Sequence, residues 1–141
     1  MANLTDSVNK ILKKKQMRNS SEILLASSSD EYFKDIASYL FRKGFAVFSV
    51  SHGDELKLVY KKRQQINLML FSTSLPGLTD LDILTRGREL YPGIPFFLLV
   101  FDINLNLLRL ADLLQVEELI RLPIEMEDLE KLIIKYLKTE L

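Results

Sequence analysis

Short apolar runs alternate with longer stretches of helical hydrophobic periodicity along most of this chain. The runs have the length and composition of buried strands, which we expect at Glu22–Ala26, Ala46–Val50, Asn67–Phe71, Pro95–Val100 and Glu118–Arg121. Apolar residues that recur every three or four positions after each run predict helices near Asp30–Lys43, after Gly53, and over Thr79–Leu90, Asn104–Leu114 and Glu125–Lys138. Nearly all-apolar runs are typical of a sheet covered on both faces.

Strand–helix units in this succession predict βαβ connections and a parallel sheet. Because such connections are right-handed, few topologies remain. We expect residues 21–141 to form an α/β domain, a flavodoxin-like (βα)5 doubly wound parallel sheet with strand order 2-1-3-4-5.

Residues 1–20 differ in character and are interpreted as a basic N-terminal extension. Leu4, Val8, Ile11 and Leu12 have helical spacing, so part of the extension is compatible with a helix. A solvated tail is the expected role, and binding of a polyanion is the alternative. The whole chain has a formal net charge of zero, which gives no general attraction to nucleic acid.

The composition excludes several kinds of site. The sequence contains no cysteine, so disulfides, thiolate catalysis and cysteine-ligated metals are excluded. His52 is the single histidine and cannot form a histidine metal cluster. No apolar run reaches the length of about 18 residues that a membrane span needs, and the first residues lack a secretory apolar segment. We therefore expect a cytoplasmic protein without a metal or another cofactor.

Several motifs resemble those of bacterial response-regulator receiver domains, in order and in spacing. The segments that carry the resemblance are Ile23-Leu24-Leu25, Pro76-Gly77 after the third strand, Arg88–Pro95 before the fourth, and Leu122-Pro123 after the fifth. The resemblance implies a signalling module in which an aspartate accepts a phosphoryl group at the carboxyl ends of the strands.

The positions that the resemblance assigns to this chemistry hold other residues here. Ser27 and Ser28 replace the acidic pair that holds Mg²⁺, and Ser72 replaces the phosphorylated aspartate. The remaining positions, which the family uses for a hydroxyl, an aromatic switch and a lysine, are Val100, Leu119 and Leu122.

These replacements remove the groups that the family's reaction needs. Mg²⁺ prefers carboxylate ligands, and a serine cannot form an acyl phosphate. The sequence therefore predicts a pseudo-receiver that is not an enzyme, binds no Mg²⁺ and acts through protein contacts. A small-ligand sensor that uses Ser27, Ser28, Ser72 and Asp102 is the alternative. A hydrolase that uses Ser72 is disfavoured because the G-x-S-x-G motif is absent.

The fourth and last helices carry apolar residues on their outward sides. Advancing about 100° per residue places Leu107 and Leu110 in a core-facing stripe, and puts a second set on the opposite side: Leu105, Arg109, Asp112 and Leu113. In the last helix Leu129, Leu132 and Ile133 face the core, whereas Ile134 points outward. Since receivers commonly dock partners there, we expect a protein partner or a homodimer on the face of the fourth helix, fifth strand and fifth helix.

Overall fold

A computed structural model describes residues 21–62 and 65–137, except for the side chains of Lys57 and Tyr60. The predicted extension over residues 1–20 and the predicted helix end at Lys138 lie outside these residues. The strands are β1 (Glu22–Ala26), β2 (Ala46–Val50), β3 (Leu68–Ser72), β4 (Phe96–Val100) and β5 (Glu118–Arg121). The helices are α2 (Glu31–Arg42), α3 (Glu55–Lys62), α4 (Asp80–Leu90), α5 (Leu105–Leu113) and α6 (Met126–Leu137).

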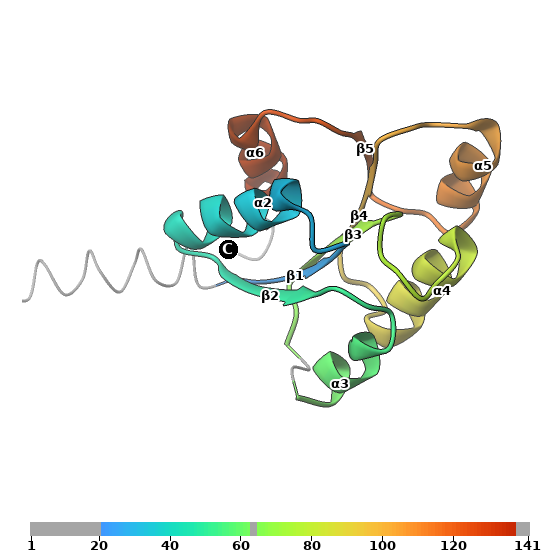
Figure 1. Ribbon diagram of the computed structural model, residues 1–141, viewed down its shortest axis with the longest axis horizontal. Coiled ribbons are helices and arrows are strands. Elements are labelled where there is room, and N and C mark those ends of the chain that lie inside the picture. Colours follow the sequence, from blue (N-terminus) through green and yellow to red (C-terminus); the bar gives the residue numbers. More distant parts are fainter. Residues whose placement is uncertain (1–20, 63–64, 138–141) are drawn as a thin grey trace, which may run out of the picture.

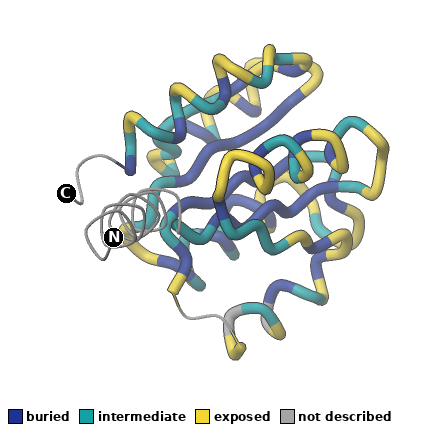
Figure 2. The backbone as a smooth tube through the Cα atoms, turned by 90° about the vertical axis from the view of Figure 1, so that its left-hand side faces the viewer, coloured by how far each residue is buried: buried dark blue, intermediate teal, exposed yellow. Residues whose placement is uncertain are grey.

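All strands are parallel and lie in the order β2-β1-β3-β4-β5, which confirms the predicted fold class. Helices α2 and α6 cover one face of the sheet, and α3, α4 and α5 cover the other (Figure 1). Strands β3 and β4 are buried along their whole length. Figure 2 shows the buried strands between helices whose outer sides are exposed. None of the described helices is long and apolar enough to cross a bilayer.

Helix ends follow local chemistry. The Thr79 hydroxyl accepts a hydrogen bond from the Asp82 N–H, and the Asp82 carboxylate accepts one from the Thr79 N–H, so α4 begins with a capping box. The Asn104 side chain caps α5 in the same way, by accepting from the Leu107 N–H at 2.8 Å. After α2 the chain turns at Gly44, whose φ of 98° favours glycine.

The predicted core stripes are mostly correct. Leu107, Leu129 and Ile133 are buried, but Leu110 and Leu132 are only partly so. The prediction of full burial is therefore wrong for Leu110, because α5 lies at the margin of the sheet and covers it only partly (Figure 1).

Arg88 ties together three parts of the chain near the amino ends of β4 and β5. Its guanidinium donates to the carbonyls of Ile94, Leu114 and Gln115, and to the Glu117 carboxylate at 2.8 Å. That carboxylate also accepts from the Phe96 N–H at 2.6 Å. These hydrogen bonds of Arg88 therefore fix the end of α4 against the start of β4 and the turn that leads into β5.

Candidate functional site

The positions singled out from the sequence meet at the carboxyl ends of the strands. Ser27 and Ser72 end or follow β1 and β3, while Val100 and Leu122 end or follow β4 and β5. Ser72 is fully buried, and Ser27 is exposed over only 4% of its surface. In open α/β sheets this edge is the usual place for ligands.

Ser72 belongs to a chain of hydrogen bonds among the serines at this edge. Its Oγ lies 2.8 Å from the Ser74 Oγ and accepts a hydrogen bond from the Ser74 N–H at 3.1 Å. The Ser74 Oγ in turn accepts from the Ser28 N–H at 3.1 Å, and the Ser27 Oγ donates to the Ser28 carbonyl at 2.9 Å. Within the described part of the chain no buried side-chain oxygen or nitrogen lacks a partner. The serines at this edge thus satisfy one another.

The other half of the cleft is apolar. Val100 and Leu122 are exposed over 1% and 3% of their surfaces, and the Leu122 N–H donates to the Val100 carbonyl at 2.7 Å. Leu122 belongs to the core under α2 and α6, and Val100 to the core under α3, α4 and α5, so neither position supplies a charge or a side-chain donor at this edge. Leu119 is partly buried and packs against the same core as Val100, under α3, α4 and α5.

An aromatic group bridges the loops above this edge. The Phe101 ring follows β4, and its centroid lies 5.9 Å from the Tyr32 centroid and 6.0 Å from that of Phe33. The Tyr32 hydroxyl accepts from the Ile124 N–H at 2.9 Å. The loops after β4 and β5 are both held to the first turn of α2 in this way.

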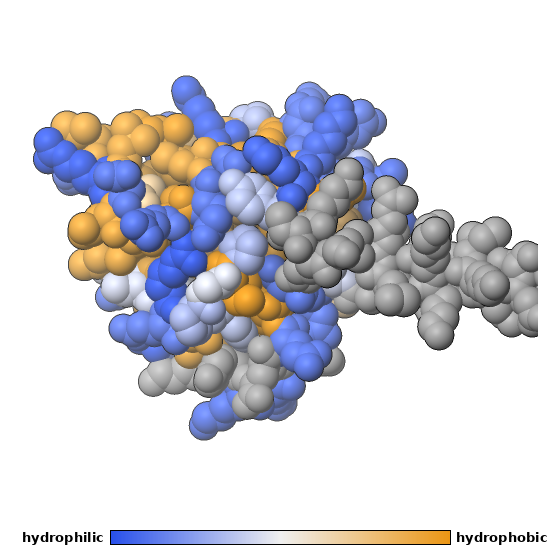
Figure 3. Space-filling view, turned by 180° about the vertical axis from the view of Figure 1, so that it is seen from behind, coloured by the Kyte–Doolittle hydropathy of each residue, from blue (hydrophilic) through white to orange (hydrophobic). Residues whose placement is uncertain are grey.

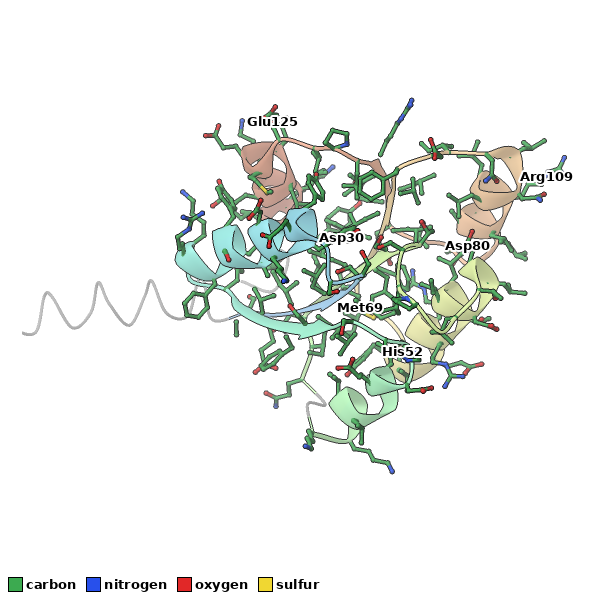
Figure 4. All side chains as sticks on the ribbon, in the orientation of Figure 1. Asp30, His52, Met69, Asp80, Arg109 and Glu125 are labelled. Atoms are coloured by element: carbon green, nitrogen blue, oxygen red, sulfur yellow. The ribbon has the colours of Figure 1, made fainter. Side chains whose placement is uncertain are left out.

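The polar side chains near this edge of the sheet are not gathered into one site. Asp102 is exposed, and the Ser28 hydroxyl donates to the Asp30 carboxylate at 3.0 Å. The His52 Nδ1 accepts from the Asp54 N–H at 3.2 Å, at the start of α3 (Figure 4). Among residues 21–62 and 65–137 no three histidine, aspartate or glutamate side chains are placed to hold a metal ion.

A hollow of about 490 Å³ opens beside the serine loop, between α2 and β2. Ser27 and Ser28 line it together with Lys34 and Ser51, whereas Ser72 and Asp102 do not. This hollow therefore includes only two of the four residues that the small-ligand alternative would combine.

The outward side of α5 is apolar, as the periodicity predicts. Leu105 and Leu113 are exposed over 61% and 74% of their surfaces, with Arg109 and Asp112 exposed between them. Figure 3 shows apolar side chains gathered at this end of the molecule among charged ones, and Figure 4 shows Arg109 pointing away from the sheet. Ile134 is partly buried and packs against the core, so it adds less to this surface.

Sequence reasoning missed three further exposed apolar residues on α5 and in the loop before it. Leu108 is exposed over 46%, Phe101 over 43% and Ile103 over 41%. Leu108 has the helical phase of Leu105 and Asp112, so the periodicity contained its signal. The two loop residues precede α5 in the chain and carry no periodic signal. We call Phe101, Ile103, Leu105, Leu108 and Leu113 the α5 surface.

No family model matches the chain, and none of the curated proteins compared with it does either. Solved structures do match. A CheY-like response regulator receiver domain protein from Methanospirillum hungatei is 20% identical with a TM-score of 0.76, over 86% of this chain and 98% of that one. The signal receiver domain of an HD domain-containing protein from Pseudomonas fluorescens is 19% identical with a TM-score of 0.77, over 86% and 97%.

A third match is the chemotaxis protein CheY4 of Vibrio cholerae, 17% identical with a TM-score of 0.73 over 83% of this chain and 98% of that one. The chain therefore has the fold of CheY-like receiver domains. At these identities the likeness concerns the fold alone.

Proposed function

We propose that this protein is a pseudo-receiver, a non-phosphorylatable protein–protein interaction module in bacterial signal transduction or regulation. The proposal places it in the cytoplasm. The observation that carries it is the state of Ser72, which is fully buried and hydrogen-bonded to Ser74.

The surroundings of Ser72 argue against phosphoryl chemistry. A serine nucleophile needs a neighbouring base, and among the described residues the only side chain that bonds the Ser72 hydroxyl is another serine. Neutral Val100 and Leu122 offer nothing to balance the charge of a phosphoryl group. Mg²⁺ would find hydroxyls in place of carboxylates at Ser27 and Ser28.

The α5 surface supports a role in contact. Exposed apolar side chains gathered on one helix and its preceding loop are typical of docking sites when they form a patch. Arg109 and Asp112 lie among them and supply charges that orient a partner. Because no covalent switch is retained, we infer that this surface binds its protein partner constitutively.

Mass analysis of the intact protein after incubation with acetyl phosphate and Mg²⁺ tests the chemical half of the proposal. We expect no gain of mass. The second half is tested by comparing Leu113→Glu with Ser72→Ala in capture from the native cell. The helix variant is expected to lose a partner that Ser72→Ala retains, and the reverse result would make the cleft the working site.

A further inference from the structure

The two edges of the sheet differ in how they are protected. Natural sheets usually guard an edge strand with charged residues or proline. Edge strand β5 has Glu118 and Arg121 at its ends, whereas the other edge strand, β2, reads Ala-Val-Phe-Ser-Val without a charge or a proline. We propose that β2 pairs antiparallel with β2 of a second copy of this chain, which joins the two sheets into one.

The outward backbone groups of β2 set the register of this pairing. The Ala46 N–H donates to the Ser21 carbonyl, and the Val50 carbonyl accepts from the Ser27 N–H, so both residues point toward β1. Since orientation alternates along a strand, the N–H and C=O groups of Val47 and Ser49 point outward. Within the described residues, no hydrogen bond to a neighbouring strand lies on that side.

A two-fold axis at Phe48 satisfies all of these groups. Val47 of one copy then lies opposite Ser49 of the other and exchanges both backbone hydrogen bonds with it, and the converse pair does the same. Phe48 meets its own copy as a non-hydrogen-bonded pair, in which side chains come closest. A partly exposed aromatic ring thus gains an aromatic cross-strand neighbour.

Hollows lie on both faces of β2 and share Ser49 and Val50 in their linings. The one under α2 measures about 490 Å³, and the one beside α3 about 360 Å³. Figure 1 shows β2 at the margin of the sheet with these two helices on either side. A second copy at this edge is placed to cover both hollows at once.

The helices that flank β2 present contact side chains toward the same edge. Tyr39 of α2 bonds Glu130 on the opposite side, so the small residues Ala37 and Ser38, which line the first hollow, face the edge. Phe41 follows one turn later on that side and is exposed over 69% of its surface. From α3, Leu58 lines the second hollow and is exposed over 56%. Small residues allow the two copies of α2 to approach, and the larger ones supply area to bury.

Charge selects a second copy over another occupant. The first turns of α2 and α3 carry Glu31 and Glu55, and their last turns carry Arg42, Lys61 and Lys62. One end of the β2 edge is therefore acidic and the other basic, apart from Lys34 near the acidic end. Antiparallel pairing places each acidic end against the basic end of the other copy, which makes the surface complementary to itself.

Sedimentation equilibrium of the full chain tests the pairing. We expect a dimer whose dissociation constant rises about tenfold or more in Leu58→Glu and Phe41→Glu. Leu113→Glu is the matched control, since it places the same charge on an exposed leucine of α5, and the dimer should persist in it. This control also separates the pairing from the proposed role of the α5 surface.

Cross-linking tests the register, because the chain has no cysteine of its own. In a hydrogen-bonded pair the Cα atoms lie about 5.5 Å apart, within the range of a disulfide. A mixture of Val47→Cys and Ser49→Cys chains should therefore form a disulfide dimer on oxidation. Each variant alone should do so far less, since identical positions are then two residues out of register.

Three results would overturn the proposal. The first is a chain that stays monomeric at every concentration measured. The second is a dimer that dissociates in Leu113→Glu but not in Leu58→Glu or Phe41→Glu. The third is cross-linking of the single cysteine variants to the same extent as the mixture.

Discussion

Replacing Ser72 by alanine is expected to lower the stability of the protein without changing its binding to a partner. The change removes an oxygen that contacts the Ser74 Oγ at 2.8 Å and accepts from the Ser74 N–H at 3.1 Å. Each such bond contributes about 1 kcal/mol net, and a donor left unsatisfied costs about 1–3 kcal/mol. The Ser74 hydroxyl keeps its hydrogen bond from the Ser28 N–H, and an alanine side chain has no polar group that needs a partner in a fully buried site. We therefore expect a loss of about 1–2 kcal/mol.

Urea unfolding measures this loss as a lower midpoint with an unchanged slope, because the same surface is exposed on unfolding. Ser29→Ala is the control. Ser29 is exposed in the same loop, and its replacement should change the free energy of unfolding by less than about 0.5 kcal/mol. Equal effects in the two variants would show that the buried hydroxyl network contributes nothing. Loss of partner binding in a folded Ser72→Ala protein would refute the reading of the cleft as inactive.

Arg88→Met should lower the free energy of unfolding by about 2–4 kcal/mol, since it strands backbone carbonyls and the Glu117 carboxylate; a double-mutant cycle with Glu117→Gln should return a coupling above about 0.5 kcal/mol. Gln115→Gly should raise the free energy of unfolding by about 0.5 kcal/mol, because Gln115 has a φ of 53°, which glycine adopts without strain. Thermal unfolding measures the gain. The hydrogen bond from Tyr39 to Glu130 raises the pKa of Tyr39 from its ordinary value of 10.0 to about 12. Stability from this contact is thus fully present below pH 10 and declines as the pH approaches 12. The free energy of unfolding of Tyr39→Phe, measured across the same pH range, should decline less than that of the unchanged protein.

Much of the fold was predictable because it depends on burial patterns. Strands read as apolar runs between helical patterns, so β1 and the partly buried edge strands β2 and β5 were predicted at their observed bounds, and β3 and β4 began one residue later than predicted. The meeting of Ser27 and Ser72 was also predictable, since parallel strands place their carboxyl ends on one edge. The partnership of Ser72 with Ser74 was not, because it depends on the conformation of the loop after β3.

Surface features were harder to read. The helical phase of Ile134 pointed outward, yet its side chain packs against the core. Periodicity gives the direction of a side chain and cannot tell how far the neighbouring layer extends. Phe101 lies in a loop, and its contacts with Tyr32 and Phe33 come from a helix far away in the sequence. Neither contact leaves a pattern in the chain.

The unequal edges of the sheet also limit how large an assembly can grow. Backbone pairing can propagate only where a bare strand remains, and an open sheet with two bare edges is a template for fibrils. Edge strand β5 carries Glu118 and Arg121, and the Glu118 carboxylate accepts a hydrogen bond from the Tyr136 hydroxyl at 2.9 Å. Each chain therefore has one edge strand without charged residues, β2, and the proposed dimer leaves only the charged β5 strands at the edges of the joined sheet. Growth by strand addition therefore stops at two chains.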